Sequence, residues 1–352
     1  MKSVTILLFR ADPPKEKRVI GVRESTPEKV IHGGNRKYLE KKLGISLLDF
    51  SASLNPFPPA ISWSPEEISL TSYPDDSYGQ LKEAIGAVFR REPEEIAVGN
   101  GSIELIRTFC SCVLKPGDRF ALEVPTFGEY QYSARLAGAE CTTLPSTAKV
   151  RFLCNPNNPT GRLISRQQVL EIQGSLPQGG YLFLDEAFIE LADPAQSLVD
   201  SRVPGLFLAR SLTKSFAVPG IRFGYGFGSP DLVCRMEAVR LPWSINAYAE
   251  SFALQAFRQY ALLEQSRTAI TRERTWLLTR FRRLGITTDP SHTNFLLLHL
   301  SYPVNTLISN LLSRGILVRD CASFGLPAAI RVAVRTREEN EALVEALETC
   351  LP

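Results

Sequence analysis

The feature that most constrains the fold is an alternation of short apolar runs with amphipathic segments, which begins at about Tyr78. The segments QLKEAIGAVFRR and SIELIRTFCSCVL have apolar residues at helical spacing, whereas EIAVGN and RFALEVP predict strands. The same alternation continues through VRFLCN, SRQQVLEIQ, YLFLDEA and GLFLARS. Because strands that alternate with helices are typical of a mostly parallel sheet covered by helices, the sequence predicts a large α/β domain.

The remaining segments predict a second, smaller domain. A long helical stretch runs from Asn246 to about Leu284, and NFLLLHL, a helix near 303–314, ILVRD, AIRVAV and a helix in EENEALVEALETC follow it. These elements indicate an α+β domain. We expect an N-terminal arm at 1–30, a part of the small domain at 31–75, the large domain with its connecting helix at 76–284, and the C-terminal small domain at 285–352.

Composition excludes several function classes. The net charge of +3 on 352 residues provides no general basic field for nucleic acid, although a local anion site stays open. No segment approaches a membrane span, and the first residues lack a signal-peptide pattern. Seven scattered cysteines form no disulfide framework and, with three distant histidines, no metal-ligand spacing. We therefore expect a cytoplasmic protein without a metal, a membrane or a nucleic-acid partner.

Polar residues follow the predicted strands at their carboxyl ends, where ligands bind in open α/β sheets. In VGNGSIELI a glycine turn precedes a helix that begins at Ser102, and the free amides of such a helix start suit a phosphate. In CNPNNPTGR two prolines and a glycine fix a loop that can aim an asparagine at a ligand. Each pattern alone is also common in ordinary turns. The candidates for one shared site are Asn100, residues 155–158, Asp185 and residues 211–214.

Asp185 and Lys214 lie at the ends of successive predicted strands and are the two candidate catalytic residues at this edge of the sheet. A buried aspartate more often caps a helix or pairs with an arginine. A lysine in a partly enclosed site, however, can lose its proton and form a Schiff base. An aspartate opposite a pyridine nitrogen keeps that ring protonated as an electron sink.

The ordered motifs GNGS, PTFGEY, NPNNPTG, DEAF and SLTKSFAVPGIRFG resemble those of fold-type I pyridoxal-phosphate enzymes of the aminotransferase class, from about His32 to the C-terminus. The resemblance implies pyridoxal 5′-phosphate as the cofactor and Lys214 as the Schiff-base lysine. It also implies a homodimer, in which residues 31–75 include a dimer arm and Tyr73 reaches the phosphate in the neighbouring subunit. Phe188 is a departure, because relatives commonly have a tyrosine there. The implied cofactor contacts are Phe127 on the ring, Asn158 on the phenolic oxygen, Asp185 on the nitrogen, and Gly101, Ser102, Ser211, Thr213 and Arg222 around the phosphate.

Within this class, IHGGN, LLDFSASLNP and VRDCASFGLPAAIRVAVRT resemble segments of the L-threonine O-3-phosphate decarboxylases of cobalamin biosynthesis, which are related to histidinol-phosphate aminotransferases. This implies that Arg331 binds the carboxylate of a small phosphorylated amino acid, while Arg319 and His32 bind its phosphate, and that Asn158 also contacts the substrate. The alternatives are surface salt bridges for the arginines and a turn position for His32. Relatives often have asparagine in place of Ser53, which leaves a contact there open.

The reaction depends on which substrate bond stands perpendicular to the cofactor plane, and the sequence does not display that pose. Decarboxylation therefore rests on the resemblance, with transamination of a phosphorylated amino compound as the alternative. A second alternative is a regulatory module that senses pyridoxal phosphate. Such modules usually carry an N-terminal DNA-binding domain, and the 31 residues before His32 are too few for one.

Overall fold

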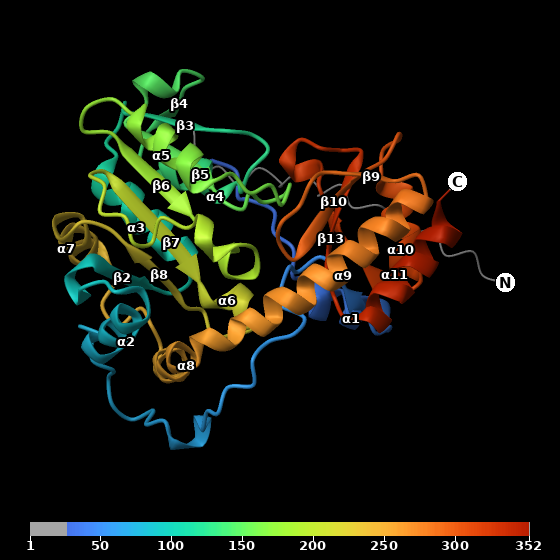
Figure 1. The fold of residues 1–352 in the computed structure, drawn as a ribbon, viewed down its shortest axis with the longest axis horizontal. Helices are drawn as coiled ribbons and strands as arrows, with labels where there is room; N and C mark the ends of the chain where they lie inside the picture. Colours follow the sequence, from blue (N-terminus) through green and yellow to red (C-terminus); the bar gives the residue numbers. More distant parts are fainter. Residues whose placement is uncertain (1–26, 352) are drawn as a thin grey trace, which may run out of the picture.

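The computed structural model describes residues 27–351, so most of the expected arm at 1–30 lies outside the described residues. Two lobes lie side by side and are joined by the long helix α9 (Figure 1). The larger lobe contains a seven-stranded sheet in the order β2-β8-β7-β6-β5-β3-β4. Its strands are β2 (Ile96–Gly99), β8 (Gly224–Phe227), β7 (Leu206–Ser211), β6 (Tyr181–Asp185), β5 (Val150–Cys154), β3 (Arg119–Leu122) and β4 (Glu140–Cys141).

All pairs in this sheet are parallel except those of β8, which runs antiparallel to β2 and β7. The expected mostly parallel α/β fold is therefore confirmed. Strand β8 was not among the predicted strands. Its four residues alternate glycine with aromatic side chains (GYGF), a pattern that sequence periodicity does not separate from a glycine-rich loop.

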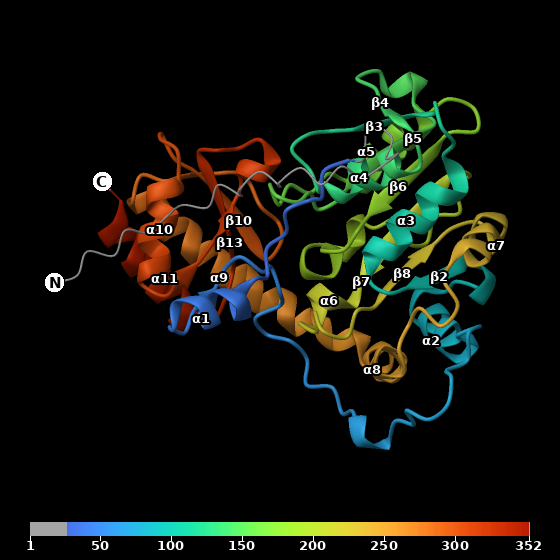
Figure 2. The ribbon, with the colours of Figure 1, turned by 180° about the vertical axis from the view of Figure 1, so that it is seen from behind.

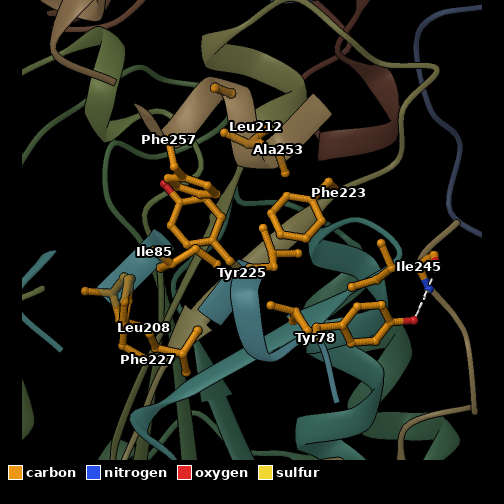
Figure 3. Packing of buried hydrophobic residues seen from close by; sticks show 14 of the residues in the cluster. Tyr78, Ile85, Leu208, Leu212, Phe223, Tyr225, Phe227, Ile245, Ala253 and Phe257 are labelled. Carbon is orange, nitrogen blue, oxygen red and sulfur yellow. Dashed lines mark hydrogen bonds between the residues drawn. The ribbon is translucent and has the colours of Figure 1, made fainter. Parts of the chain in front are cut away.

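Helices cover both faces of the large sheet because its central strands are apolar on both sides. Along β6, Leu182 and Leu184 face one core cluster and Phe183 faces the other. The first cluster contains residues of α2 (Gly79–Phe89), α5 (Arg166–Gly174) and α8 (Ala247–Arg258), and Figure 3 shows part of this packing, with Tyr78 hydrogen-bonded to Ile245. The second contains residues of α3 (Ser102–Val113), α4 (Glu129–Leu136) and α7 (Pro230–Val239).

The smaller lobe has an antiparallel sheet in the order β12-β13-β10-β9, formed by Arg319–Asp320, Ala329–Ala333, Phe295–His299 and Thr287–Thr288. Helices α9 (Leu263–Arg283), α10 (Asn305–Ser313) and α11 (Arg337–Cys350) contribute to its core. The early segment also belongs here, because β1 (Leu48–Asp49) pairs with β11 (Ile316–Leu317), and α1 (Arg36–Leu43) lies beside the small domain (Figure 2).

The helical stretch expected from Asn246 to about Leu284 is two helices, α8 and α9, separated by a turn at Tyr260–Leu262. At that turn the Tyr260 hydroxyl donates a hydrogen bond to Glu190 inside the large domain. This contact with a buried carboxylate holds the chain in place where α8 has ended. Within residues 27–351, no helix is long and apolar enough to cross a membrane. The same residues contain no His, Cys, Asp or Glu group suited to a metal ion.

Candidate active site

A cavity of about 550 Å³ lies at the carboxyl ends of β5, β6 and β7 and reaches the small domain. Parallel strands place their last residues on one edge of a sheet, which brings residues distant in sequence to this wall. Of the residues expected to bind the cofactor or the substrate, Gly101 and Tyr73 are outside the lining. The cavity is lined by His32, Ser102, Phe127, Asn158, Asp185, Ser211, Thr213, Lys214, Arg222, Arg319 and Arg331.

Lys214 lies in the short helix α6 (Leu212–Ser215), which directly follows β7. Its Nζ is 5.9 Å from the ring centre of Phe188, and the residue is half-buried at the cavity wall. Burial, and then the charges of Arg331 and Arg222, lower the pKa of Lys214 to about 8. A substantial fraction of the amine is therefore neutral near neutral pH, as a nucleophilic lysine requires.

Asp185 is the last residue of β6 and is 3% exposed. Its Oδ1 accepts the Ala187 amide at 2.8 Å, and its Oδ2 accepts the Tyr130 hydroxyl at 2.7 Å. Burial raises the pKa of Asp185, while these two hydrogen bonds and the charge of Lys214 lower it. The carboxyl group is thus held in a fixed orientation at the cavity wall, and among residues 27–351 no arginine is paired with it.

The turn before α3 brings a helix start, a glycine and a guanidinium together. Gly101 has a φ of +76°, and a Cβ there would lie 2.4 Å from Arg222 Nη2, so only glycine allows this approach. Arg222 has a φ of 62° and donates to Pro219 O. The amide end of α3 and Arg222 both favour an anion, and the hydroxyl-bearing Ser211 and Thr213 lie on the same cavity wall.

The four residues 155–158 have different positions. Asn155 exchanges two hydrogen bonds with the Ile164 backbone, and Asn157 binds Pro125 O and Thr126, so both fix the loop. Asn158 lines the cavity, and its Oδ1 accepts from Arg331. Its amide Nδ2 is therefore the group that it can offer to a ligand. Asn100 is exposed and donates to Ser244 O, away from the cavity lining.

Arg319 and Arg331 lie directly opposite each other on β12 and β13. Residues opposite each other in an antiparallel pair have side chains on the same face, so both extend from one face of the small sheet. Each is 7% exposed, and their donors meet neutral oxygens: Arg319 binds Ile31 O and Ser323, and Arg331 binds Ser51 O and Asn158.

Neither guanidinium forms a salt bridge with a carboxylate among residues 27–351. Burial lowers the pKa of Arg331 to about 10 and lowers that of Arg319 as well. Both side chains nevertheless remain cationic at neutral pH. Two buried cations without acidic partners, on one cavity wall, are suited to two anionic groups of a ligand.

His32 lines the cavity from the segment before α1. Its Nε2 is 2.8 Å from Glu129 Oε1 at the start of α4, and its ring centre is 5.8 Å from that of Phe127. The segment also contacts the small domain, because Arg319 donates to Ile31 O. His32 therefore bridges the two sides of the cavity mouth, and its ring is already paired with a carboxylate.

Tyr73 is 80% exposed and lies outside the cavity lining of its own chain. Its ring lies against that of Trp243, with centres 4.6 Å apart and planes tilted by 32°. Trp243 is itself largely exposed, and its backbone amide donates to Asp76. An exposed aromatic pair of this kind is unusual on an isolated surface and suits a contact with another molecule.

Three residues at the cavity were not identified as functional candidates from the sequence. Tyr130 binds Asp185, Glu129 binds His32, and Cys154 lies opposite Asp185 in the β5–β6 register. The only sequence signal for the first two was their place in PTFGEY, directly after Phe127. Phe188 packs on Phe295 and presents a ring face to Lys214, so this side of the lysine has no hydroxyl donor.

Residues 42–347 match the model of the family described as aminotransferase class I and II. A histidinol-phosphate aminotransferase of Symbiobacterium thermophilum is 32% identical over 89% of this chain and 93% of its own length. A protein of Caldanaerobacter subterraneus named "Putative threonine-phosphate decarboxylase" is 34% identical over 84% of this chain and 88% of its own length.

The fold agrees with these matches. The crystal structure of a histidinol-phosphate aminotransferase of Sinorhizobium meliloti in complex with pyridoxal 5′-phosphate superposes with a TM-score of 0.81, at 22% identity, over 91% of this chain and 95% of that one. The chain therefore belongs to the aminotransferase class I and II family, whose cofactor is pyridoxal 5′-phosphate, and within it to the group that contains histidinol-phosphate aminotransferases and threonine-phosphate decarboxylases.

Proposed function

We propose that this protein decarboxylates L-threonine O-3-phosphate to (R)-1-aminopropan-2-yl phosphate, a step of cobalamin biosynthesis, with pyridoxal phosphate as cofactor. The observation that carries the substrate class is the pair of buried arginines Arg319 and Arg331, which lie opposite each other on one sheet face and have no acidic partner among residues 27–351. A substrate with a carboxylate and a phosphate offers one anion to each. The relative named for threonine phosphate, at 34% identity, supports this choice.

The residues present fit the cofactor. The start of α3, Gly101 and Arg222 form a cradle that a Cβ at position 101 would fill, and it would hold the phosphate. Asp185, buried and fixed by two donors, would pair with the ring nitrogen. Phe127 would stack on the ring, and Asn158 Nδ2 would donate to the phenolic oxygen.

When bound, pyridoxal phosphate supplies an aldehyde that joins to amines and a ring that accepts the electron pair of a bond broken at the substrate α-carbon. Lys214 Nζ would hold the cofactor at its aldehyde, and the lowered pKa of Lys214 favours the neutral, nucleophilic amine. Arg331 orients the carboxylate, which leaves as carbon dioxide. Lys214, which lines the same cavity, would give the proton that replaces carbon dioxide on that carbon.

Arg319 and His32 would hold the substrate phosphate. His32 Nε2 is 2.8 Å from Glu129 Oε1, and this contact orients the imidazole at the cavity mouth. Ile31 precedes His32 in the chain, and its carbonyl oxygen accepts a hydrogen bond from Arg319. One segment therefore contacts both residues that would bind the phosphate.

The protein acts as a homodimer in which Tyr73 serves the neighbouring site. The exposed aromatic pair of Tyr73 and Trp243 supports this, because Tyr73 lies outside its own cavity and its apolar ring is left on the surface.

The deciding experiment incubates the holoprotein with threonine phosphate and measures carbon dioxide release and the aminopropanol phosphate product. A parallel reaction contains histidinol phosphate and 2-oxoglutarate. Carbon dioxide from the first reaction supports the proposal. Amino transfer in the second reaction, without decarboxylation in the first reaction, contradicts the proposal. The activity would then be that of a histidinol-phosphate aminotransferase, the name of the 32% identical relative.

Borohydride reduction tests the cofactor site separately. We expect the holoprotein to be yellow and the reduced cofactor to be attached to Lys214, with no stable attachment in Lys214→Ala. Attachment to another lysine would contradict the assignment. Bound cofactor with neither turnover would favour a sensing module.

A further inference from the structure

Tyr130 is the side chain that connects the two expected cofactor-ring contacts. Its hydroxyl donates to Asp185 Oδ2 at 2.7 Å. Its ring lies edge-on to Phe127, with centres 5.5 Å apart and planes at 80°. Asp185 belongs to β6 and Phe127 to the loop before α4, so no backbone element fixes the distance between them.

The position of Tyr130 is itself fixed. The residue is 1% exposed, and its ring stacks on Phe152 with centres 5.6 Å apart and planes at 10°. Phe152 lies on β5, beside β6 in the sheet. The ring therefore packs on the sheet on one side and on Phe127 on the other, while the hydroxyl reaches the end of β6.

The hydrogen-bond donors and charges around Asp185 indicate what the Tyr130 hydroxyl does. Among residues 27–351 Asp185 accepts one other hydrogen bond, from the Ala187 amide, and the positive charge that lowers its pKa is that of Lys214. Burial and the Asp185 charge raise the pKa of Tyr130 well above its usual value, so its hydroxyl stays a donor at all working pH values. An ionised carboxylate in an apolar wall needs such donors to remain ionised.

We propose that Tyr130 is a positioning residue that holds Asp185 ionised and oriented toward the ring nitrogen of the cofactor, and that keeps Phe127 at stacking distance from the same ring. This inference rests on the proposed cofactor site and adds a residue to it. The hydroxyl and the ring of Tyr130 contact Asp185 and Phe127, so we expect its effect to pass through these two residues.

Three variants separate the two tasks. Tyr130→Phe removes the hydroxyl and keeps the ring, and Tyr130→Leu removes both. Tyr132→Phe is the matched control, because Tyr132 lies on the same helix but its ring packs against Arg107 instead. The readouts are the affinity of the apoprotein for pyridoxal phosphate, followed by absorbance, and the thermal unfolding of the apoprotein.

A hydrogen bond to a charged group contributes more than one to a neutral group, so we expect Tyr130→Phe to weaken cofactor affinity by about tenfold. Tyr130→Leu should weaken it further, and Tyr132→Phe should change it by less than about twofold. The acid limb of the pH–rate profile should move to higher pH in Tyr130→Phe, because loss of a donor raises the pKa of Asp185.

A double-mutant cycle excludes a general packing effect. In the Asp185→Asn background there is no charge for the hydroxyl to stabilise, so Tyr130→Phe should then reduce affinity by less than about twofold. An equal loss in both backgrounds, or no loss in either, overturns the inference. The borohydride attachment at Lys214 is independent of this result, so a failure here with Lys214 still labelled leaves the proposed function standing.

Discussion

Replacement of Arg319 by alanine should abolish much of the preference for a phosphorylated substrate. In the structure the Arg319 guanidinium is almost fully buried, and its Nη2 donates at 2.8 Å to Ile31 O and at 2.7 Å to Ser323. Neither partner is charged, so a substrate phosphate would meet a cation whose charge is not yet neutralised. A charge-assisted contact of this kind contributes roughly 1.5–3 kcal/mol.

That free energy corresponds to a loss of roughly tenfold to hundredfold in kcat/KM for threonine phosphate. Threonine lacks the phosphate, so its slow turnover should change by less than about twofold. Arg331→Ala should instead reduce kcat/KM for both substrates by similar factors, since both carry the carboxylate. The ratio of the two kcat/KM values is therefore the quantity to measure.

The assay follows carbon dioxide release from both substrates in wild type, Arg319→Ala, Arg331→Ala and Arg314→Ala. Arg314 is a suitable control because it is an exposed arginine of the same domain, at the end of α10. Equal losses for threonine and threonine phosphate in Arg319→Ala would refute the assignment of Arg319 to the phosphate, and would show that the variant damages the site in general.

Four further outcomes are expected. The extent of reductive methylation of Lys214 in the apoprotein, measured by peptide mass spectrometry, should rise with pH and have a midpoint near pH 8. The reason is that the lowered pKa of Lys214 makes its amine neutral above that pH. A midpoint near that of ordinary lysines would contradict the desolvated site. Asp185→Asn should reduce turnover far more than cofactor retention, and near wild-type turnover would make Asp185 structural. Arg210→Met leaves the buried carboxylate of Glu186 without its partner at 2.9 Å, so the free energy of unfolding measured in denaturant should fall by about 3–5 kcal/mol, and an unchanged value would refute the pairing. Mixing inactive Tyr73→Ala and Lys214→Ala proteins should restore activity through mixed dimers with one intact site, whereas no recovery despite subunit exchange would argue against a shared site.

The buried cluster around Arg210 shows that position in the sequence alone does not identify the residues that face the cavity. Arg210 immediately precedes Ser211, and Glu186 immediately follows Asp185, yet the two point away from the cavity and pair with each other inside the large domain. Neighbouring residues on a strand face opposite sides of the sheet. The DEAF and RSLTK motifs therefore each carry one residue for the cavity and one for the core.

The fold class and much of the cavity wall could be predicted from the chain because both depend on local patterns. Apolar runs separated by amphipathic helices specify a parallel sheet, and such a sheet places Asp185 and Lys214 on one edge whatever the details of packing. The sequence also predicted the second domain from its later strands and helices, and these elements form the antiparallel sheet and its covering helices.

Tertiary structure alone decided which side chains meet. The Tyr130 hydroxyl reaches Asp185 across 55 residues, and His32 meets Glu129 across 97. The register of β12 and β13 sets Arg319 against Arg331, and a shift by one residue would turn one of them to the other face. Local periodicity specifies an element and its buried face, but contacts between elements depend on register, helix orientation and the packing of rings such as Phe127 and Phe152, which no local pattern encodes.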